Sequence, residues 1–187
     1  MASIYLVLTA TGTLISRCIG LYTRARYNHV SLCLDSKINE FYSFGRKIRW
    51  FPLIGGFVIE RIDSGMFKAY GETTCAIYRL EVSDKKFEML EKEITPFIKN
   101  KKMYGFNIIG LISIMFNMPM NRKNKYFCTQ FVASMLQRSG IHDFLKESSL
   151  VTPQDFYDIP HLEPVFEGRL RDFGKSKAPA MSTAAAQ

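Results

Sequence analysis

The first 82 residues carry apolar positions in short blocks and alternations, which is the pattern of a β-sheet. Ser3–Ala10 is an almost unbroken apolar run of strand length, as expected for a buried strand. After it, apolar residues in Gly12–Arg24 are spaced for a short helix. Turn residues then separate four further predicted strands, the first two of which form a hairpin: His29–Asp35, Asn39–Gly45, Gly55–Ile62 and Thr73–Val82.

The period changes to that of helices after Val82. Ser83 is a predicted N-cap, and Pro96 is expected to kink or end the helix that follows it. Further helices are predicted over 106–117, over 128–139 and, briefly, after Thr152, with a last strand at "PVFEGRL". The predicted fold class is therefore α+β, with an antiparallel sheet packed against helices.

The chain length predicts the number of domains, and the net charge indicates the kind of partner. A chain of 187 residues fits one domain, here residues 1–173, followed by the small, polar segment 174–187, which we interpret as a disordered or appended tail. The net charge of +8 suits an acidic partner, such as an anionic membrane surface. Nucleic acid is disfavoured, because the basic residues form short scattered groups without a base-reading motif. The oligomeric state is left open.

The cysteine spacing indicates no metal site, and the N-terminus indicates where in the cell the protein is located. Cys18, Cys33, Cys75 and Cys128 form no CxxC pair and no cluster at zinc spacing. The glycines match no phosphate-binding loop, so we predict no metal and no cofactor. The N-terminus lacks the basic region of a secretory signal, which favours a reducing, cytoplasmic location with free thiols.

The most apolar later segment is Phe106–Met118, "FNIIGLISIMFNM". It is shorter than the roughly 20 residues that cross a membrane as a helix. We expect a buried core helix; the alternatives are a wall of an apolar substrate pocket or a membrane-facing lid.

Cys128 begins the predicted helix in "NKYFCTQFVASML", and the helical period puts it on the apolar face. The positive end of a helix dipole favours a thiolate there. Cys128 is therefore either a nucleophile or a small buried residue, and its position alone leaves both interpretations open.

A thiolate nucleophile needs a base, and His29 is the best placed of three histidines. It opens a strand whose odd positions, His29, Ser31, Cys33 and Asp35, are mostly polar. A hairpin turn of two or four residues would place Glu40 and Tyr42 on the face of His29, with Glu40 opposite Ser31 in one register and Tyr42 nearest in another. This predicts a thiol, an imidazole and an orienting carboxylate.

"YNHVSLCLDSKINEFYSFGRK", followed about 100 residues later by "KYFCTQFVASML", resembles the circularly permuted branch of the NlpC-type papain-like superfamily, which includes lecithin retinol acyltransferase-like proteins and many bacterial proteins. In that branch the histidine strand precedes the cysteine helix. The resemblance implies a permuted papain-like fold over roughly residues 4–173.

By position, the resemblance implies Cys128 as nucleophile, His29 as general base and Glu40 as third residue, although some relatives have a second histidine there. "MYGFN" resembles a cleft-lining segment, which makes Tyr104 a candidate substrate contact, together with Tyr42. The expected activity is that of a cysteine hydrolase, chiefly an amidase or peptidase acting through an acyl-thioester. The alternatives are a lipid acyl hydrolase or transferase and a non-catalytic binding module.

Overall fold

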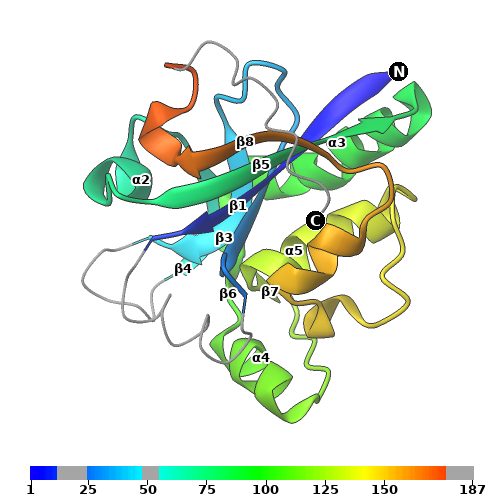
Figure 1. The fold of residues 1–187 in the computed structure, drawn as a ribbon. Helices are drawn as coiled ribbons and strands as arrows, with labels where there is room; N and C mark the ends of the chain where they lie inside the picture. Colours follow the sequence, from blue (N-terminus) through cyan, green and yellow to red (C-terminus); the bar gives the residue numbers. More distant parts are fainter. Residues whose placement is uncertain (12–24, 48–54, 176–187) are drawn as a thin grey trace, which may run out of the picture.

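The computed structural model describes residues 1–11, 25–47 and 55–175. The predicted helix Gly12–Arg24 lies outside them, as does nearly all of the tail. The described chain is built on an eight-stranded sheet in the order β7-β6-β4-β3-β2-β1-β5-β8, antiparallel except for the β6–β7 pair (Figure 1). Its strands are β1 Ala2–Ala10, β2 His29–Cys33, β3 Phe41–Arg46, β4 Gly55–Glu60, β5 Thr74–Val82, β6 Gly105–Phe106, β7 Lys125–Tyr126 and β8 Glu163–Arg169.

The helices follow the sheet strands in the second half of the chain. The α-helices of the described residues are α2 Gly65–Ala69, α3 Asp84–Lys99, α4 Ile108–Ser113 and α5 Cys128–Arg138. Short 3₁₀ helices are η1 Lys101–Met103, η2 Ile114–Phe116, η3 Ser148–Leu150, η4 Pro153–Asp158 and η5 Leu170–Asp172. The α+β class is thereby confirmed. The described elements that periodicity did not predict span five residues or fewer, too few to show a period: α2, β6, β7, η1, η3 and η5.

Two apolar clusters cover the two faces of the sheet. Even-numbered side chains of β1, β2 and β3, such as Leu6, Leu32 and Phe44, pack with α3 and α5 in the larger cluster. Odd-numbered ones, such as Val7 and Phe41, pack with α2 and η5 in the smaller cluster. This division follows from the two-residue period of a strand.

The ends of α3 and α5 lie close to the helix ends predicted from the sequence. Ser83 caps α3 by accepting a hydrogen bond from the Lys86 amide at 3.4 Å. Pro96 lies inside α3, which continues to Lys99, so the proline does not end the helix. Gly140 follows α5 with a φ of 66°, the left-handed conformation that commonly terminates helices.

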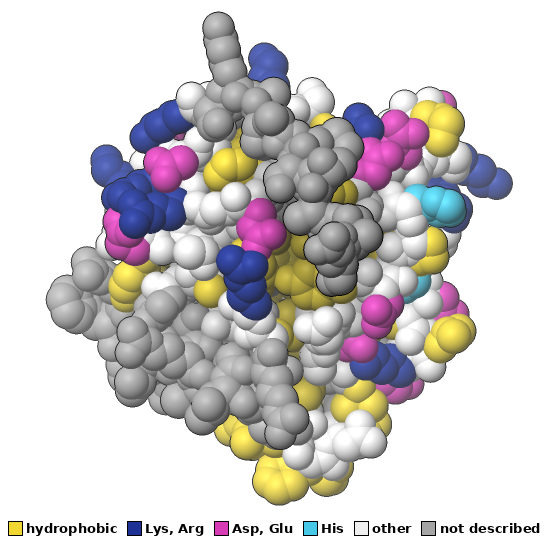
Figure 2. Space-filling view, viewed as in Figure 1, with side chains coloured by type: hydrophobic (Ala, Val, Ile, Leu, Met, Phe, Trp, Pro, Cys, Tyr) yellow, Lys and Arg dark blue, Asp and Glu magenta, His cyan; other side chains and the backbone are white. Residues whose placement is uncertain are grey.

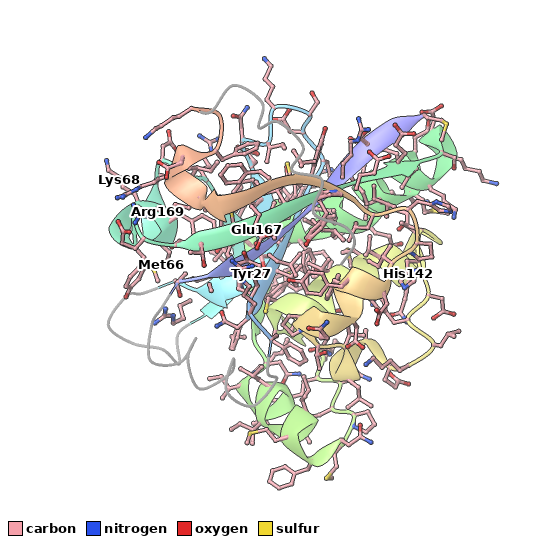
Figure 3. All side chains as sticks on the ribbon, in the orientation of Figure 1. Tyr27, Met66, Lys68, His142, Glu167 and Arg169 are labelled. Carbon is pink, nitrogen blue, oxygen red and sulfur yellow. The ribbon has the colours of Figure 1, made fainter. Side chains whose placement is uncertain are left out.

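A buried tyrosine fixes the chain just before β2. The single proton of the Tyr27 hydroxyl is shared between two acceptors, the Glu167 carboxylate of β8 at 3.1 Å and the Cys75 carbonyl of β5 at 3.3 Å (Figure 3). Burial and the neighbouring Glu167 raise the pKa of this hydroxyl, so it stays a donor. The Asn28 amide also donates to the Thr9 carbonyl at 3.1 Å. These bonds set where β2, and hence His29, begins.

The expectation of a buried core helix over 106–118 is wrong. The segment forms α4 and η2, which project from one end of the molecule (Figure 1). Ile109, Ile112 and Phe116 are at least half exposed. In the described part of the chain, no helix has the length and apolar character needed to cross a membrane.

Candidate functional site

Cys128 is the first residue of α5, as predicted, and it is only 9% exposed. The predicted apolar face is confirmed, because the following members of that face are all fully buried: Phe131, Val132, Met135 and Leu136. The helix packs on β2 and β3. The cysteine thus sits at the positive end of a helix that lies against the strand of His29.

The backbone N–H groups at the start of α5 have no hydrogen-bond acceptor among the described residues. Phe127 occupies the N-cap position, where its side chain cannot accept a hydrogen bond. The first intrahelical bond runs from the Phe131 amide to the Phe127 carbonyl at 2.9 Å. Among the described residues, the amides of Cys128, Thr129 and Gln130 have no acceptor. Such amides at a helix N-terminus stabilise negative charge.

His29, the first residue of β2, is paired with a carboxylate. Its Nε2 lies 3.0 and 3.2 Å from the two carboxylate oxygens of Glu60, at the end of β4. The Ser31 hydroxyl donates to Glu60 Oε2 at 2.7 Å and lies 3.3 Å from the same ring nitrogen. The side chains of His29 and Glu60 are only 17% and 13% exposed. The carboxylate is therefore held by a buried serine and directed at the imidazole.

The Cys128 thiol lies near enough to the His29 imidazole to influence its pKa. Burial by itself would lower the pKa of His29. The negative charge of Glu60, the neighbouring Cys128 and the hydrogen bonds with Glu60 outweigh it, and the pKa lies well above its ordinary value. The environment therefore favours the imidazolium form of His29, which could form an ion pair with a Cys128 thiolate.

Gly45 makes room for the contact between His29 and Glu60. A Cβ added at Gly45 in β3 would lie 3.8 Å from Glu60 Oε1, 3.8 Å from His29 Cε1 and 3.5 Å from Val58 Cγ2. These are ordinary contact distances for one methyl group, but a larger side chain would occupy the space between the two partners. β3 separates β2 from β4 in the sheet. The glycine therefore lets a carboxylate of β4 reach across β3.

The predicted register of the β2–β3 hairpin is wrong. Leu32 pairs with Tyr42, so odd positions of β2 share a face with odd positions of β3. The connection between the strands has an odd number of residues, 34–40, and contains Ile38 with a φ of 53°. An odd connection reverses the parity expected for a two- or four-residue turn.

Glu40 is consequently not the partner of His29. It lies outside β3 and forms an ion pair with Arg61, and the Tyr42 hydroxyl donates to its carboxylate at 3.5 Å. Glu60 takes the place that the sequence prediction gave to Glu40. Glu60 was missed because β4 is not the hairpin neighbour of β2, and hairpin parity reports only on neighbouring strands.

The two tyrosines predicted to contact substrate lie in aromatic stacks. Tyr42 stacks on Phe57 with a centroid distance of 6.4 Å, and Tyr104 stacks on Phe97 at 4.3 Å. Tyr42 faces the α3 and α5 side of the sheet, with Leu32. No contact in the described residues joins either ring to His29, and their roles as substrate contacts stay predictions.

Thr9 is a further polar residue of this region that the sequence did not single out. It pairs with His29 across β1 and β2, and directly opposed side chains on paired strands are neighbours. Its hydroxyl is completely buried and has no hydrogen-bond partner among the described residues. Thr9 therefore brings a spare hydroxyl to the neighbourhood of the imidazole.

The other described thiols differ from Cys128. Cys33 and Cys75 are free and fully buried, and burial raises the pKa of each to about 12. The remaining histidines lie elsewhere. His142 follows the C-terminal end of α5 (Figure 3), and His161 is exposed. Cys128 and His29 are thus the thiol and imidazole that the fold brings together.

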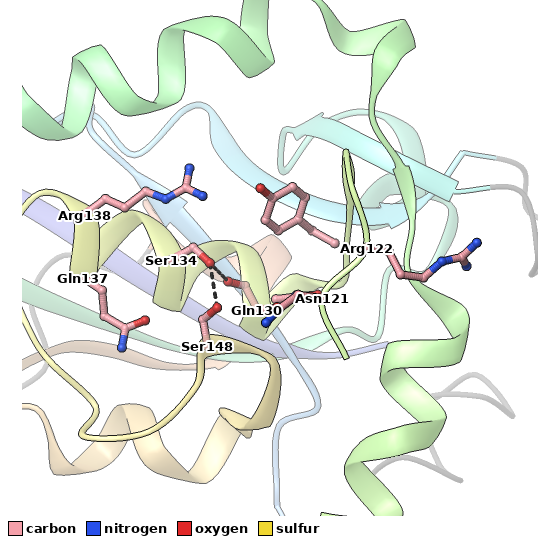
Figure 4. Close-up of a pocket in the computed structure, with 8 residues that line it drawn as sticks. Asn121, Arg122, Gln130, Ser134, Gln137, Arg138 and Ser148 are labelled. Atoms are coloured by element: carbon pink, nitrogen blue, oxygen red, sulfur yellow. Dashed lines mark hydrogen bonds between the residues drawn. The ribbon is translucent and has the colours of Figure 1, made fainter. Parts of the chain in front are cut away.

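A separate polar pocket of about 270 Å³ lies beside α5 (Figure 4). Its lining includes Asn121, Arg122, Gln130, Ser134, Arg138 and Ser148. The Ser134 hydroxyl donates to the Gln130 carbonyl at 2.7 Å and forms a hydrogen bond with the Ser148 hydroxyl at 3.0 Å. Neither Cys128 nor His29 lines it. No group of three or more His, Cys, Asp or Glu side chains in residues 1–11, 25–47 and 55–175 is arranged to hold a metal ion.

Comparisons with known proteins identify no relative, so the function of the site is argued from its chemistry. No family model matches the sequence, and no curated protein matches it at a significant level.

Proposed function

We propose that this protein is a cysteine-dependent hydrolase or acyltransferase that acts on an amide or ester carbonyl through Cys128, His29 and Glu60. The supporting observation is the position of the His29 imidazole, which pairs with the Glu60 carboxylate at 3.0 Å and lies near the Cys128 thiol. A nucleophile, a base and a group that orients the base are the components of a covalent catalytic site. The low exposure of His29 and Glu60 keeps competing water away from this ion pair.

The first step is proton transfer within the pair. Nε2 of His29 is engaged by Glu60 and Ser31, which leaves Nδ1 to receive the thiol proton. Glu60 stabilises the resulting imidazolium, and the N-terminus of α5 stabilises the thiolate. The thiolate sulfur then attacks the substrate carbonyl carbon and forms a C–S bond.

The second step needs donors for the carbonyl oxygen, which becomes an oxyanion. The free amides at the start of α5, of which Cys128 is the first, supply such donors. When the intermediate collapses, the bond to the amine or alcohol breaks, and His29 returns its proton to that leaving group. Water or an acceptor, deprotonated by His29, attacks the acyl-thioester and releases the Cys128 thiol.

The arrangement of the elements supports the finer fold assignment that we propose, a permuted papain-like domain. The histidine strand β2 precedes the cysteine helix α5, which packs on β2 and β3. This is the order of the permuted NlpC-type branch that the sequence resembles. The fold alone does not define the substrate.

Two substrate classes follow from this chemistry. Amides, including peptides, are the class that the resemblance favours. Lipid esters are the second class, and the exposed apolar surface of α4 and η2 supports them, because an enzyme acting on acyl chains must reach a lipid phase. In a non-catalytic binding module, by contrast, Cys128 would be an inert core residue.

The thiol chemistry is tested by the rate of iodoacetamide alkylation of Cys128 against pH, with the modified site mapped by mass spectrometry. We expect Cys128 to react faster than a free thiol at neutral pH, and His29→Ala to abolish this advantage. His142→Ala is the matched control, since it removes a histidine outside the site. Cys33 and Cys75 are internal controls that should stay unmodified in the folded protein.

The proposal is wrong if Cys128 alkylates no faster than a free thiol and His29→Ala changes nothing. The substrate class is tested next, by the intact mass of protein incubated with p-nitrophenyl esters of short and long acids and with peptide p-nitroanilides. An acyl adduct that maps to Cys128 and is absent in Cys128→Ala identifies the thioester. A long-chain adduct without turnover of any anilide would exclude the peptidase form.

A further inference from the structure

We infer that α4 and η2, together with the basic segments on either side of them, form a docking surface for bilayers that contain anionic phospholipid. The inference does not depend on the thiol chemistry proposed above. The apolar part of this surface, residues 108–118, is called the lobe. The inference rests on three observations about the lobe and its surroundings. They concern its exposed apolar side chains, the charge around it and the way it is held.

The lobe concentrates the exposed apolar surface of the protein. Ten large apolar side chains of the described residues are exposed, and five of them fall within ten consecutive positions. These are Ile109, Ile112, Met115, Phe116 and Met118, with exposed fractions of 50, 52, 50, 69 and 56%. Figure 2 shows apolar side chains gathered at the end of the molecule where α4 lies. A cluster of this kind marks an interaction site rather than an ordinary surface.

The chain around the lobe is basic throughout. Residues 94–142 contain seven Lys or Arg and no Asp or Glu, a net charge of +7 compared with +8 for the whole chain. Six of the seven are close to the lobe in sequence: Lys99, Lys101, Lys102, Arg122, Lys123 and Lys125. Among the described residues none of the six forms an ion pair. Their charge is therefore available to anionic headgroups.

The lobe is held rigidly at its base, so the exposure does not come from loose packing. The buried Asn107 side chain accepts a hydrogen bond from the Gly110 amide at 3.1 Å and donates to the Met120 carbonyl at 3.0 Å and to Gln130 Oε1 at 3.2 Å. The Ser113 hydroxyl donates to the Gly110 carbonyl at 2.8 Å. A Cβ at Gly110 would lie 2.2 Å from Asn107 Nδ2, so only glycine fits there.

The same hydrogen bonds place the lobe beside the start of α5. Gln130 belongs to the first turn of α5, two residues after Cys128. The backbone N–H of Asn107 also donates to the carbonyl of Tyr126, two residues before Cys128, at 2.9 Å. A bilayer bound at the lobe therefore lies at the end of the molecule that carries the cysteine.

A cluster of exposed apolar side chains with basic segments on both sides of it in the sequence fits a lipid interface better than it fits other acidic partners. Interfacial segments combine large apolar residues, which enter the acyl boundary, with Lys and Arg, which meet the headgroups. A nucleic acid would use the cations and leave Ile112 and Phe116 exposed. A second copy of the chain would cover the apolar residues and bring two basic surfaces together.

The experiment measures flotation of the full chain with vesicles of phosphatidylcholine and phosphatidylserine, and with vesicles of phosphatidylcholine alone. We expect strong binding to the former, which falls as salt is raised, and weak binding to the latter. Phe116→Ser should lower the partition coefficient about ten-fold or more, because a large side chain no longer leaves water. Lys101→Gln and Lys123→Gln should each lower it about five-fold.

Matched variants keep the result specific to the lobe. Leu145→Ser removes an apolar side chain that is 91% exposed elsewhere, and Lys85→Gln with Lys86→Gln removes exposed charges at the start of α3. Both should bind like the wild type, as should Cys128→Ala, which separates docking from catalysis. Unchanged far-ultraviolet circular dichroism shows that each variant is folded.

Three results would overturn the inference. In the first, Phe116→Ser and Leu145→Ser bind the anionic vesicles equally. In the second, neutral and anionic vesicles bind alike at every salt concentration. In the third, no vesicle binds, and sedimentation shows instead a dimer that Phe116→Ser dissociates, or an RNA complex that Phe116→Ser leaves intact.

Discussion

Replacing Glu60 by glutamine tests the central contact of the site with little change in shape. The amide has the size of the carboxylate, and its oxygen can still accept the Ser31 hydroxyl that now lies 2.7 Å from Glu60 Oε2. The negative charge 3.0 Å from His29 Nε2 is lost. The main consequence should therefore be a change in the proton affinity of His29.

The size and sign of the effect follow from proton linkage. The pKa of His29 is raised by Glu60 and Cys128 above its ordinary value of 6.5. The folded protein therefore binds a proton more tightly than the unfolded chain, and this contribution to stability is complete below pH 6.5. It is lost as the pH rises from 6.5 through the folded-state pKa, with a slope of up to about 1.4 kcal/mol per pH unit for one proton.

Glu60→Gln should be less stable than the wild type by about 1.5–3 kcal/mol at pH values below the ordinary histidine pKa, the usual contribution of a hydrogen bond to a charged group. The difference should shrink as the pH rises, because the wild-type His29 then loses its charge. The assay is urea unfolding at a series of pH values from below 6.5 to well above it. The free energy of unfolding of the wild type should fall across this range, with a shallower fall in Glu60→Gln.

Glu40→Gln is the matched control, because Glu40 pairs with Arg61 instead of His29 and its replacement should leave the slope unchanged. Repeating both series in a Cys128→Ala background removes the titration of the thiol, which is coupled to that of the imidazole. Equal slopes for the wild type and Glu60→Gln, or a change of slope in Glu40→Gln instead, would refute the pairing of His29 with Glu60.

Three further predictions concern single contacts. Gly45→Ala should leave the alkylation rate of Cys128 unchanged. In Gly45→Val the larger side chain should separate His29 from Glu60 and lower the alkylation rate. Equal rates in the two variants would contradict the space that we assign to Gly45 between these residues. Gly110→Ala should lower the urea midpoint, at a cost of about 1–3 kcal/mol from overpacking against Asn107, while Gly71→Ala, which meets only an ordinary contact of 3.6 Å, should not. Cys33 and Cys75 should react with iodoacetamide only in urea, and labelling of either in the folded protein would contradict their complete burial.

Within the described residues, the predicted and the observed elements agree wherever a period was long enough to be read. The strands of the described residues that span five positions or more begin and end within about two residues of their predicted bounds. The helix that starts at Cys128 and the cap at Ser83 were found because capping and amphipathic spacing are local signals. The apolar segment Phe106–Met118 was misjudged because hydrophobicity alone does not tell whether a short helix is buried or presented to a partner.

Local sequence patterns were enough to predict the α+β class, the order of the longer described elements, and Cys128 and His29 as the thiol and imidazole to examine. All of these depend on neighbours within one strand or one turn of helix. The partner of His29 was decided only by the tertiary structure. The odd length of the β2–β3 connection reversed the parity of the hairpin, and the absence of a side chain at Gly45 left room for Glu60 to reach across β3. Contacts between strands that are not neighbours depend on register and on empty space, and neither has a local signature in the chain.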